Sequence, residues 1–217
     1  MDEPLDVTAT RAAYDTVAVS YEELLRGLMA EKVYDRAMLA AFTERVVGTG
    51  NINVLDAGCG PGRITSYLAS LGLDTRGMDL SPAMVAVARK AHPGLEFRVG
   101  TIEALDAAPG SLGGVVAWYS LIHTPPERLP GVFEAFRGAL EDGGFLLLAF
   151  QVGDAGRHID RAYGHDVSYD AFLMNPERVT TMLENAEFRL EAQLVREPDK
   201  DEKTPQAYLI ARKPAQH

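Results

Sequence analysis

The chain has 217 residues, of which 47% are hydrophobic, a formal net charge of -10 and one cysteine. The length and apolar content suit a single domain with a full-sized core, and the acidic balance argues against nucleic acid as a partner, because phosphate backbones repel negative charge. One cysteine excludes an internal disulfide, and we find neither a signal peptide nor an apolar stretch of membrane-spanning length, so we predict a cytoplasmic protein without membrane association.

The first part of the chain, residues 8–47, is predicted to be helical in two or more pieces, with Gly27 as a weak point where the helix bends. Tyr14 and Tyr21 are seven residues apart and therefore lie on one face of a helix.

A glycine-rich loop follows the first predicted strand, residues 52–56. That strand ends at Asp56 and continues into Gly58-Cys59-Gly60-Pro61-Gly62. After a predicted helix, a second strand ends at Asp79. Ligands of open α/β sheets bind outside the carboxyl ends of the strands. We therefore expect a nucleoside above the glycines, with the Asp79 carboxylate accepting hydrogen bonds from ribose hydroxyls.

The spacing of these glycines differs from two common nucleotide motifs. The dinucleotide fingerprint G-x-G-x-x-G or G-x-G-x-x-A needs a small residue at position 63, where this chain has arginine. The loop also lacks the Lys-Ser/Thr ending of the phosphate-binding loop. The pattern argues against NAD, FAD and nucleoside triphosphates.

The rest of the chain alternates strands and helices. A helix is predicted from Ser81-Pro82 to residue 91, another after a capping box at 124–127, and a third from Asn175-Pro176. Further strands are predicted over residues 95–99, 115–119, 145–150, 188–195 and 206–211, the last two as an antiparallel pair. Residues 151–174 have no clean period. Solid apolar strands between helices predict an α/β fold with a mostly parallel sheet.

The segment 54–62, Val-Leu-Asp-Ala-Gly-Cys-Gly-Pro-Gly, resembles the first motif of class I S-adenosylmethionine-dependent methyltransferases, and the resemblance extends through residues 77–84, 115–123 and 140–148. It implies a Rossmann-like three-layer sandwich with a mostly parallel seven-stranded sheet, an antiparallel last strand and an N-terminal helical lid. The single methyltransferase domain, 1–217, then divides into a lid (1–47), a cofactor-binding core (52–150), a substrate insert (151–175) and a C-terminal helix and strand pair (176–213).

The resemblance also implies cofactor contacts. Gly58 and Gly60 let the backbone lie against the methionine part of S-adenosylmethionine, and Asp56 orients the loop, directly or through water to the amino group. Asp79 holds the ribose. The residues expected beside the adenine are Leu80, Met84, Thr101 and Ile102. Many relatives have Asp-Ala at 101–102, so here a threonine hydroxyl or a backbone group has to serve the adenine.

Four aromatic residues are further expected cofactor contacts. The pattern around Tyr14 and Tyr21 resembles the lid helix of the small-molecule branch, so the two rings close over the cofactor; alternatively they form an ordinary buried helix face. Trp118 and Tyr119 pack near the cationic sulfonium; alternatively one of them belongs to the core.

His123 is the candidate catalytic residue. It follows the predicted strand 115–119, beside the expected methyl group, and a neutral imidazole can accept a proton from the acceptor. The alternative is a structural role, capping or packing at the loop before Thr124. Methyl transfer is an in-line displacement in which proximity and orientation do most of the catalytic work.

The insert carries the polar side chains of Asp154, His158, Asp160, His165 and Asp166, but their spacing matches no standard ligand set, so no metal is predicted. Tyr163, Tyr169 and Phe172 are expected to wall a substrate pocket.

These features predict an enzyme that transfers a methyl group from S-adenosylmethionine to an oxygen or nitrogen atom of a small molecule, with S-adenosylhomocysteine as the product cofactor. The alternatives are a non-methylating enzyme on the same cofactor (a lyase or cyclase), a protein methyltransferase, and a binding protein with an inactive site. We expect a monomer or homodimer.

Overall fold

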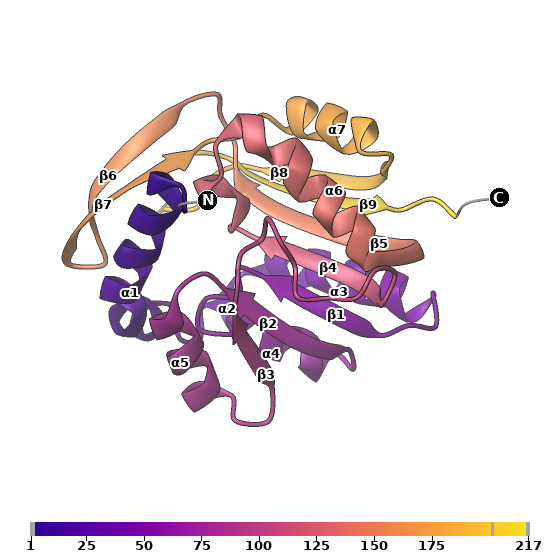
Figure 1. Cartoon of the computed structure of the whole chain (residues 1–217), viewed down its shortest axis with the longest axis horizontal. Coiled ribbons are helices and arrows are strands. Elements are labelled where there is room, and N and C mark those ends of the chain that lie inside the picture. The colour runs from indigo at the N-terminus through magenta and orange to yellow at the C-terminus, as the bar shows by residue number, and fades with distance from the viewer. Residues whose placement is uncertain (1–2, 201, 216–217) are drawn as a thin grey trace.

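The computed structural model describes residues 3–200 and 202–215, so residues 1–2 of the predicted lid lie outside the described part (Figure 1). The helices are α1 (Leu5–Leu25), α2 (Leu28–Glu31), α3 (Val33–Val47), α4 (Arg63–Ser70), α5 (Pro82–Ala91), α6 (Leu129–Ala139) and α7 (Pro176–Asn185), with short 3-10 turns η1 (Leu121–His123) and η2 (Pro126–Arg128). The strands are β1 (Asn53–Ala57), β2 (Asp74–Asp79), β3 (Glu96–Val99), β4 (Leu112–Trp118), β5 (Leu140–Gln151), β6 (Gly156–Ala162), β7 (His165–Phe172), β8 (Arg189–Arg196) and β9 (Gln206–Arg212).

Seven strands form one twisted sheet in the order β3-β2-β1-β4-β5-β9-β8. Neighbours from β3 to β5 pair in parallel, and β9 pairs antiparallel with both β5 and β8. The predicted fold class, a mostly parallel sheet with an antiparallel last strand, is therefore confirmed. The strand order reverses between β1 and β4, which is the position where open α/β sheets bind ligands.

The core consists of two apolar layers, one on each face of the sheet. Phe133 and Phe136 of α6 pack with Leu183 of α7 on one face, and Phe42 of α3 packs with Leu68 of α4 on the other. All five side chains are fully buried. These layers cover both faces of the sheet and leave the carboxyl ends of the strands open to a site.

Two predicted helix starts are confirmed by their caps. Ser81 Oγ accepts from the backbone N–H of Met84 at 3.0 Å, and Asn175 Oδ1 accepts from those of Glu177 and Arg178. The capping box predicted at 124–127 is wrong, because Thr124 makes no cap hydrogen bond and a 3-10 turn precedes α6, which begins at Leu129.

Two strands begin earlier than predicted because they contain glycines. β4 begins at Leu112 and includes Gly113 and Gly114, whereas the predicted strand began at residue 115. A Cβ at Gly113 would lie 1.8 Å from the backbone oxygen of Asn51, so here glycine permits close backbone approach inside a strand. β5 likewise includes Gly143 and Gly144, which exchange backbone hydrogen bonds with Lys213 after β9.

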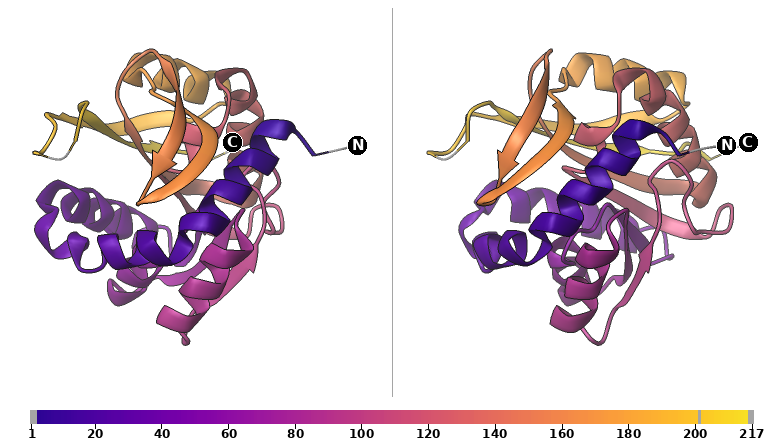
Figure 2. Two further views of the ribbon diagram at one scale, coloured as in Figure 1. Left: turned by 90° about the vertical axis from the view of Figure 1, so that its left-hand side faces the viewer. Right: turned by 60° about the vertical axis from the view of Figure 1, so that its left-hand side comes forward.

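The segment without a clean period folds as the β6–β7 hairpin. β6 is largely exposed and carries no alternation. β7 does alternate, because Tyr169 and Ala171 are buried between exposed neighbours, and the sequence analysis missed this short pattern. The hairpin lies beside α1 across the carboxyl ends of the sheet, as the two views in Figure 2 show. Ser20 of α1 and His165 of β7 are hydrogen-bonded at 2.8 Å. Two segments far apart in sequence thus form one cover.

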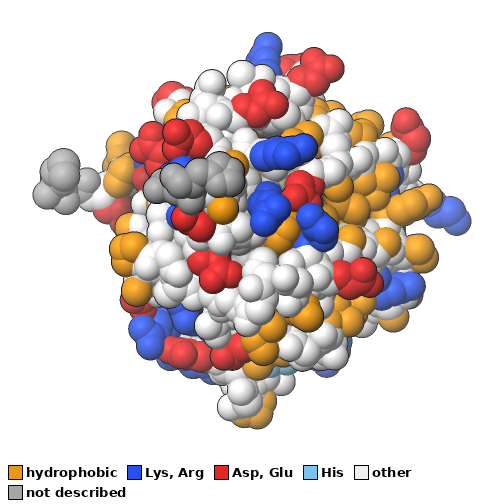
Figure 3. Space-filling model, turned by 90° about the vertical axis from the view of Figure 1, so that its right-hand side faces the viewer, with side chains coloured by type: hydrophobic (Ala, Val, Ile, Leu, Met, Phe, Trp, Pro, Cys, Tyr) orange, Lys and Arg blue, Asp and Glu red, His pale blue; other side chains and the backbone are white. Residues whose placement is uncertain are grey.

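On the face drawn in Figure 3, basic and acidic side chains intermingle. None of the helices within residues 3–200 and 202–215 is both long and apolar enough to cross a bilayer.

Candidate active site

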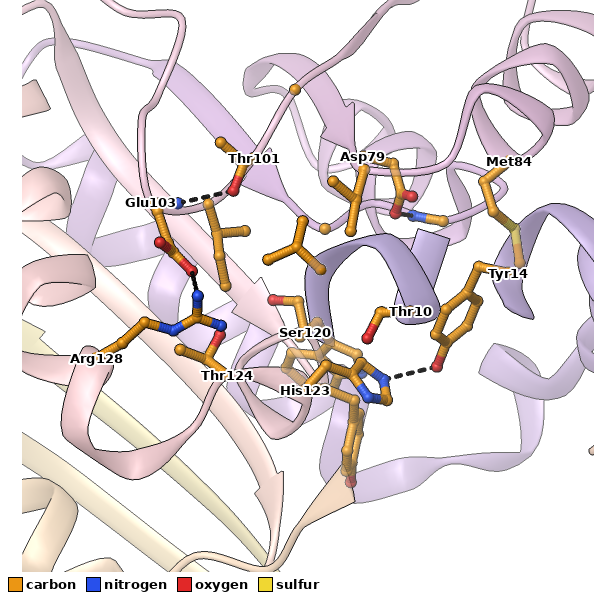
Figure 4. A pocket seen from close by; sticks show the side chains of 18 of the residues that line it. Thr10, Tyr14, Asp79, Met84, Thr101, Glu103, Ser120, His123, Thr124 and Arg128 are labelled. Carbon is orange, nitrogen blue, oxygen red and sulfur yellow. Dashed lines mark hydrogen bonds and ion pairs between the residues drawn. The ribbon is translucent and has the colours of Figure 1, made fainter. Parts of the chain in front are cut away.

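A cavity lies beneath α1 at the carboxyl ends of β1, β2 and β4 (Figure 4). Twelve of the thirteen predicted site residues line it: Tyr14, Tyr21, Gly58, Gly60, Asp79, Leu80, Met84, Thr101, Ile102, Trp118, Tyr119 and His123. Fold topology thus brings together residues from five separate segments of the chain.

The glycine loop forms the floor of this cavity. Gly58 and Gly60 have φ values of +83° and +53°, which side chains rarely adopt. The backbone N–H groups of Gly58 and Cys59 both donate to the carbonyl of Met78, which ties the loop to β2. A Cβ at Gly58 would lie 2.2 Å from the Cβ of Ser120. The loop therefore needs glycine at this position for both its backbone conformation and its packing.

Asp79 presents its carboxylate at the end of β2. Its Oδ2 accepts from the N–H of Gly60 at 2.7 Å, and its Oδ1 accepts from the N–H of Ser81 at 2.8 Å. Burial raises the pKa of this carboxyl, and the two backbone hydrogen bonds act in the opposite direction. Each oxygen keeps a further lone pair, so a pair of ligand hydroxyls can still be accommodated.

Asp56 is fully buried at the end of β1 and lines a neighbouring cavity. Its Oδ2 accepts from the hydroxyl of Thr65 at 2.6 Å, whereas its Oδ1 is buried without a hydrogen-bond partner among the described residues. Burial raises the pKa of this carboxyl to about 7. An unpaired carboxylate oxygen at such a depth suits a cationic ligand group.

A cluster of aromatic rings closes the cavity from the lid side. Tyr14 and Tyr21 of α1 meet edge to face, with ring centroids 6.1 Å apart. Tyr163 at the tip of the hairpin packs on Tyr21 at 4.8 Å, and Tyr169 of β7 packs on Tyr14 at 5.8 Å. Residue spacing in the hairpin could not reveal these contacts, because they join it to a helix more than 140 residues away.

Asp15 fastens the lid helix to α5. Its Oδ1 accepts from the hydroxyl of Ser81 at 2.5 Å and from the backbone N–H of Ala83 at 3.0 Å. Since Ser81 also follows Asp79 by two residues, the lid is attached directly beside the predicted ribose site. Asp15 is not among the site residues predicted from the sequence.

His123 is held at both ring nitrogens. Its Nε2 lies 2.8 Å from the hydroxyl of Tyr14, and its Nδ1 lies 3.3 Å from the backbone carbonyl of Asp170. Because a carbonyl only accepts, Nδ1 carries the proton and Nε2 accepts from Tyr14. Burial lowers the pKa of His123 to about 4, partly countered by the Asp170 carbonyl. The ring is therefore neutral near pH 7 and joins the core, the lid helix and the hairpin.

Residues 54–144 match a family model described as a methyltransferase domain. Over 152 residues the chain is 30% identical to a ubiquinone biosynthesis O-methyltransferase of Xanthomonas campestris pv. campestris, covering 64% of this chain and 63% of that protein. The match thus spans less than two thirds of the relative's length.

Residues 54–144 of this chain are therefore similar to a methyltransferase domain.

Two solved structures show the same fold as this chain. One is the 1,6-didemethyltoxoflavin-N1-methyltransferase of Burkholderia thailandensis, crystallised with 1,6-didemethyltoxoflavin and S-adenosylhomocysteine; it has 20% identity and a TM-score of 0.69, covering 99% of this chain and 93% of that one. The other is the magnesium protoporphyrin IX methyltransferase of Synechocystis PCC 6803 with bound S-adenosylmethionine, at 18% identity and a TM-score of 0.70, covering 98% and 100%.

A second cavity adjoins the first. The two share several lining residues, namely Tyr14, Tyr21, Gly58, Gly60, Trp118 and Tyr119. The second cavity is also lined by Arg63, which follows the glycine loop and whose Nη1 is buried without a hydrogen-bond partner among the described residues. Its other lining residues include Lys32, Asp35, Gln151, Glu202 and Gln206. Sequence reasoning missed these five, because no motif links them.

Two predictions in this region concern packing and metal binding. Trp118 and Tyr119 both line the cavities, and Trp118 also belongs to the core layer that contains Phe42 and Leu68, as the alternative expected of one of the two. In the hairpin, His158 lies 2.7 Å from Asp170 and 3.3 Å from Asp160. Within the described ranges no group of three His, Cys, Asp or Glu side chains is placed to hold one metal ion. The absence of a metal stays a prediction.

Proposed function

We propose that this protein transfers a methyl group from S-adenosylmethionine to an oxygen or nitrogen atom of a small molecule. The observation that carries the proposal is the single cavity in which the glycine loop, the Asp79 carboxylate and the aromatic lid meet. When bound, the cofactor supplies an electrophilic methyl group on a sulfonium.

The chain's own groups fit this cofactor. Asp79 holds the ribose with the lone pairs left free by Gly60 and Ser81. Asp56 and Arg63 are a buried carboxylate and a buried guanidinium with unpaired atoms on the same cavity wall, and they suit the ammonium and carboxylate of the methionine part. The adenine side is formed by Leu80, Met84, Thr101 and Ile102.

Catalysis in this proposal rests on position. The rings of Tyr14, Tyr21, Trp118 and Tyr119 surround the methyl-bearing end of the site, where they exclude water and attract a cation. Orienting two reactants can account for roughly 7–11 kcal/mol of a barrier. A neutral His123 provides a proton acceptor once its Nε2 is released from Tyr14, and this base role stays a prediction.

A small acceptor is favoured over a protein because side chains of the lid helix and of the hairpin, Tyr14, Tyr21 and Tyr163, line the cavities. The relatives named above are an O-methyltransferase and an N-methyltransferase, which supports oxygen or nitrogen as the methylated atom. A monomer or homodimer stays a prediction, as does the absence of nucleic acid partners.

The test is calorimetry with S-adenosylhomocysteine and, separately, NAD. We expect binding of the former only. Asp79→Ala should weaken it by about 1.5–3 kcal/mol, as expected for loss of a charged hydrogen-bond acceptor. Asp74→Ala, at the exposed start of the same strand, is the control. Binding of NAD alone would refute the proposal, and an acceptor product whose mass does not rise by one methyl group would favour the lyase or cyclase alternative.

A further inference from the structure

The far wall of the second cavity comes from parts of the chain outside the matched segment 54–144. Asp35 lies in the first turn of α3, Gln151 ends β5 and Gln206 begins β9. Together with the glycine loop and with Trp118 and Tyr119 at the end of β4, these residues line the cavity, and we call them its far wall. Given the proposed function, on which this inference rests, it is the surface left for the acceptor once the cofactor occupies the loop side.

Most of the charges on this wall are already paired. Lys32 Nζ lies 2.5 Å from Asp199 and 3.3 Å from Glu202. Glu202 in turn accepts from both terminal nitrogens of Arg196, at 2.5 and 2.7 Å. These ion pairs satisfy each other, so they offer no net charge to a ligand.

Asp35 is different. The residue is only 5% exposed. Its Oδ1 accepts a hydrogen bond from the hydroxyl of Tyr208 at 2.6 Å. Its Oδ2 has no hydrogen bond or ion pair with any other residue in 3–200 or 202–215, yet Asp35 lines the cavity. Tyr208, which donates to Asp35, lies close to the proposed methyl-transfer site, because its ring centroid is 5.4 Å from that of Trp118. Burial raises the pKa of Asp35, while the Tyr208 hydrogen bond and the nearby cations Arg196, Arg63 and Lys32 act in the opposite direction.

We propose that the acceptor is a small organic amine, whose ammonium or amine N–H donates to Oδ2 of Asp35 in the second cavity. A carboxylate oxygen that lines a cavity and has no hydrogen-bond partner can accept from a ligand, and a cationic donor binds it more strongly than a neutral one. An anionic acceptor would be repelled by the same oxygen. Arg63 does not reverse this preference, since its guanidinium faces the carboxylate of the cofactor in the proposed complex.

The test uses benzylamine, benzyl alcohol and benzoate, which share a ring and differ in charge. Ligand-observed NMR measures their binding to the protein saturated with S-adenosylhomocysteine. We expect benzylamine to bind most tightly. Asp35→Asn should weaken benzylamine about tenfold or more, while Glu44→Gln, on the exposed side of the same helix, should leave it unchanged. Asparagine can still accept from Tyr208, so the variant retains that packing.

Benzoate or benzyl alcohol binding as tightly as benzylamine would overturn the proposal, and so would undetectable benzylamine binding or an Asp35→Asn variant that binds it normally. The comparison of the three probes needs only the unaltered protein, so a poorly folding variant does not remove the test. Failure of S-adenosylhomocysteine to bind counts against the proposed function instead, and the three probes are then compared on the free protein.

Discussion

The hydroxyl of Tyr14 lies 2.8 Å from Nε2 of His123, although 109 residues separate them in the chain. Tyr14 belongs to the lid helix, and His123 belongs to the turn that follows β4. The same imidazole contacts the hairpin through the Asp170 carbonyl. One neutral ring therefore fastens both halves of the cover to the core.

Tyr14→Phe should loosen this fastening. The variant keeps the ring contacts with Tyr21 and Tyr169 but leaves His123 Nε2 without its donor, at a cost of about 1 kcal/mol. We expect S-adenosylhomocysteine to dissociate about fivefold faster in stopped-flow experiments. Tyr34→Phe removes a hydroxyl from a side chain that is 54% exposed and is the control. Equal dissociation rates in Tyr14→Phe and the unaltered protein would argue against a fastening role.

The buried His123 makes stability depend on pH in a specific direction. Burial lowers its folded-state pKa from 6.5 to about 4, so between these values the unfolded chain binds the proton and the folded one does not. Stability contributed by the neutral ring is present above this window and is lost as the pH falls through it. From about pH 7 to about pH 5 the loss is about 2 kcal/mol. The free energy of unfolding, measured by denaturant titration at both pH values for the unaltered protein and for His123→Gln, isolates this contribution. An equal loss of stability in both proteins between the two pH values would contradict it.

Asp56 should make cofactor affinity pH-dependent. Its pKa is raised to about 7, mainly by burial, so half of the carboxyl is protonated near neutrality. If the ionised form pairs with the ammonium of S-adenosylhomocysteine, affinity rises by up to about tenfold from about pH 6 to about pH 8. Calorimetry in two buffers of different ionisation enthalpy should then detect proton release. Asp56→Asn keeps an acceptor for Thr65 and should show a flatter profile; an unchanged slope in that variant would assign the effect to another group.

Gly58→Ala should destabilise the protein by about 2–4 kcal/mol, because it adds backbone strain at a φ of +83° and a contact of 2.2 Å with Ser120 Cβ. Gly72→Ala is the matched control, with a φ of +95° and no atom within 4 Å of the added Cβ, and should cost about 1 kcal/mol. Thermal unfolding compares the two. Adding Ser120→Gly to Gly58→Ala should recover part of the loss, whereas strictly additive effects would exclude the contact as its cause.

Much of the fold follows from local patterns. The apolar strands, the Ser81 and Asn175 caps and the glycine loop are short-range signals, and each occurs where expected because its physical cause lies within a few residues. The exceptions have a tertiary cause. Gly113 and Gly114 lie inside β4 rather than in a turn because Asn51 and Phe42 approach the strand there.

The sequence by itself determined the cofactor side of the site, since the loop, Asp79 and the end of β4 all belong to adjacent strands whose order the βαβ pattern dictates. Only the tertiary structure decided the cover and the far wall. The partners of Tyr14, Asp15 and Asp35 come from residues 66 to 173 positions away, and no spacing rule links such residues. Their pairing depends on how α1, the β6–β7 hairpin and β9 pack around the finished sheet.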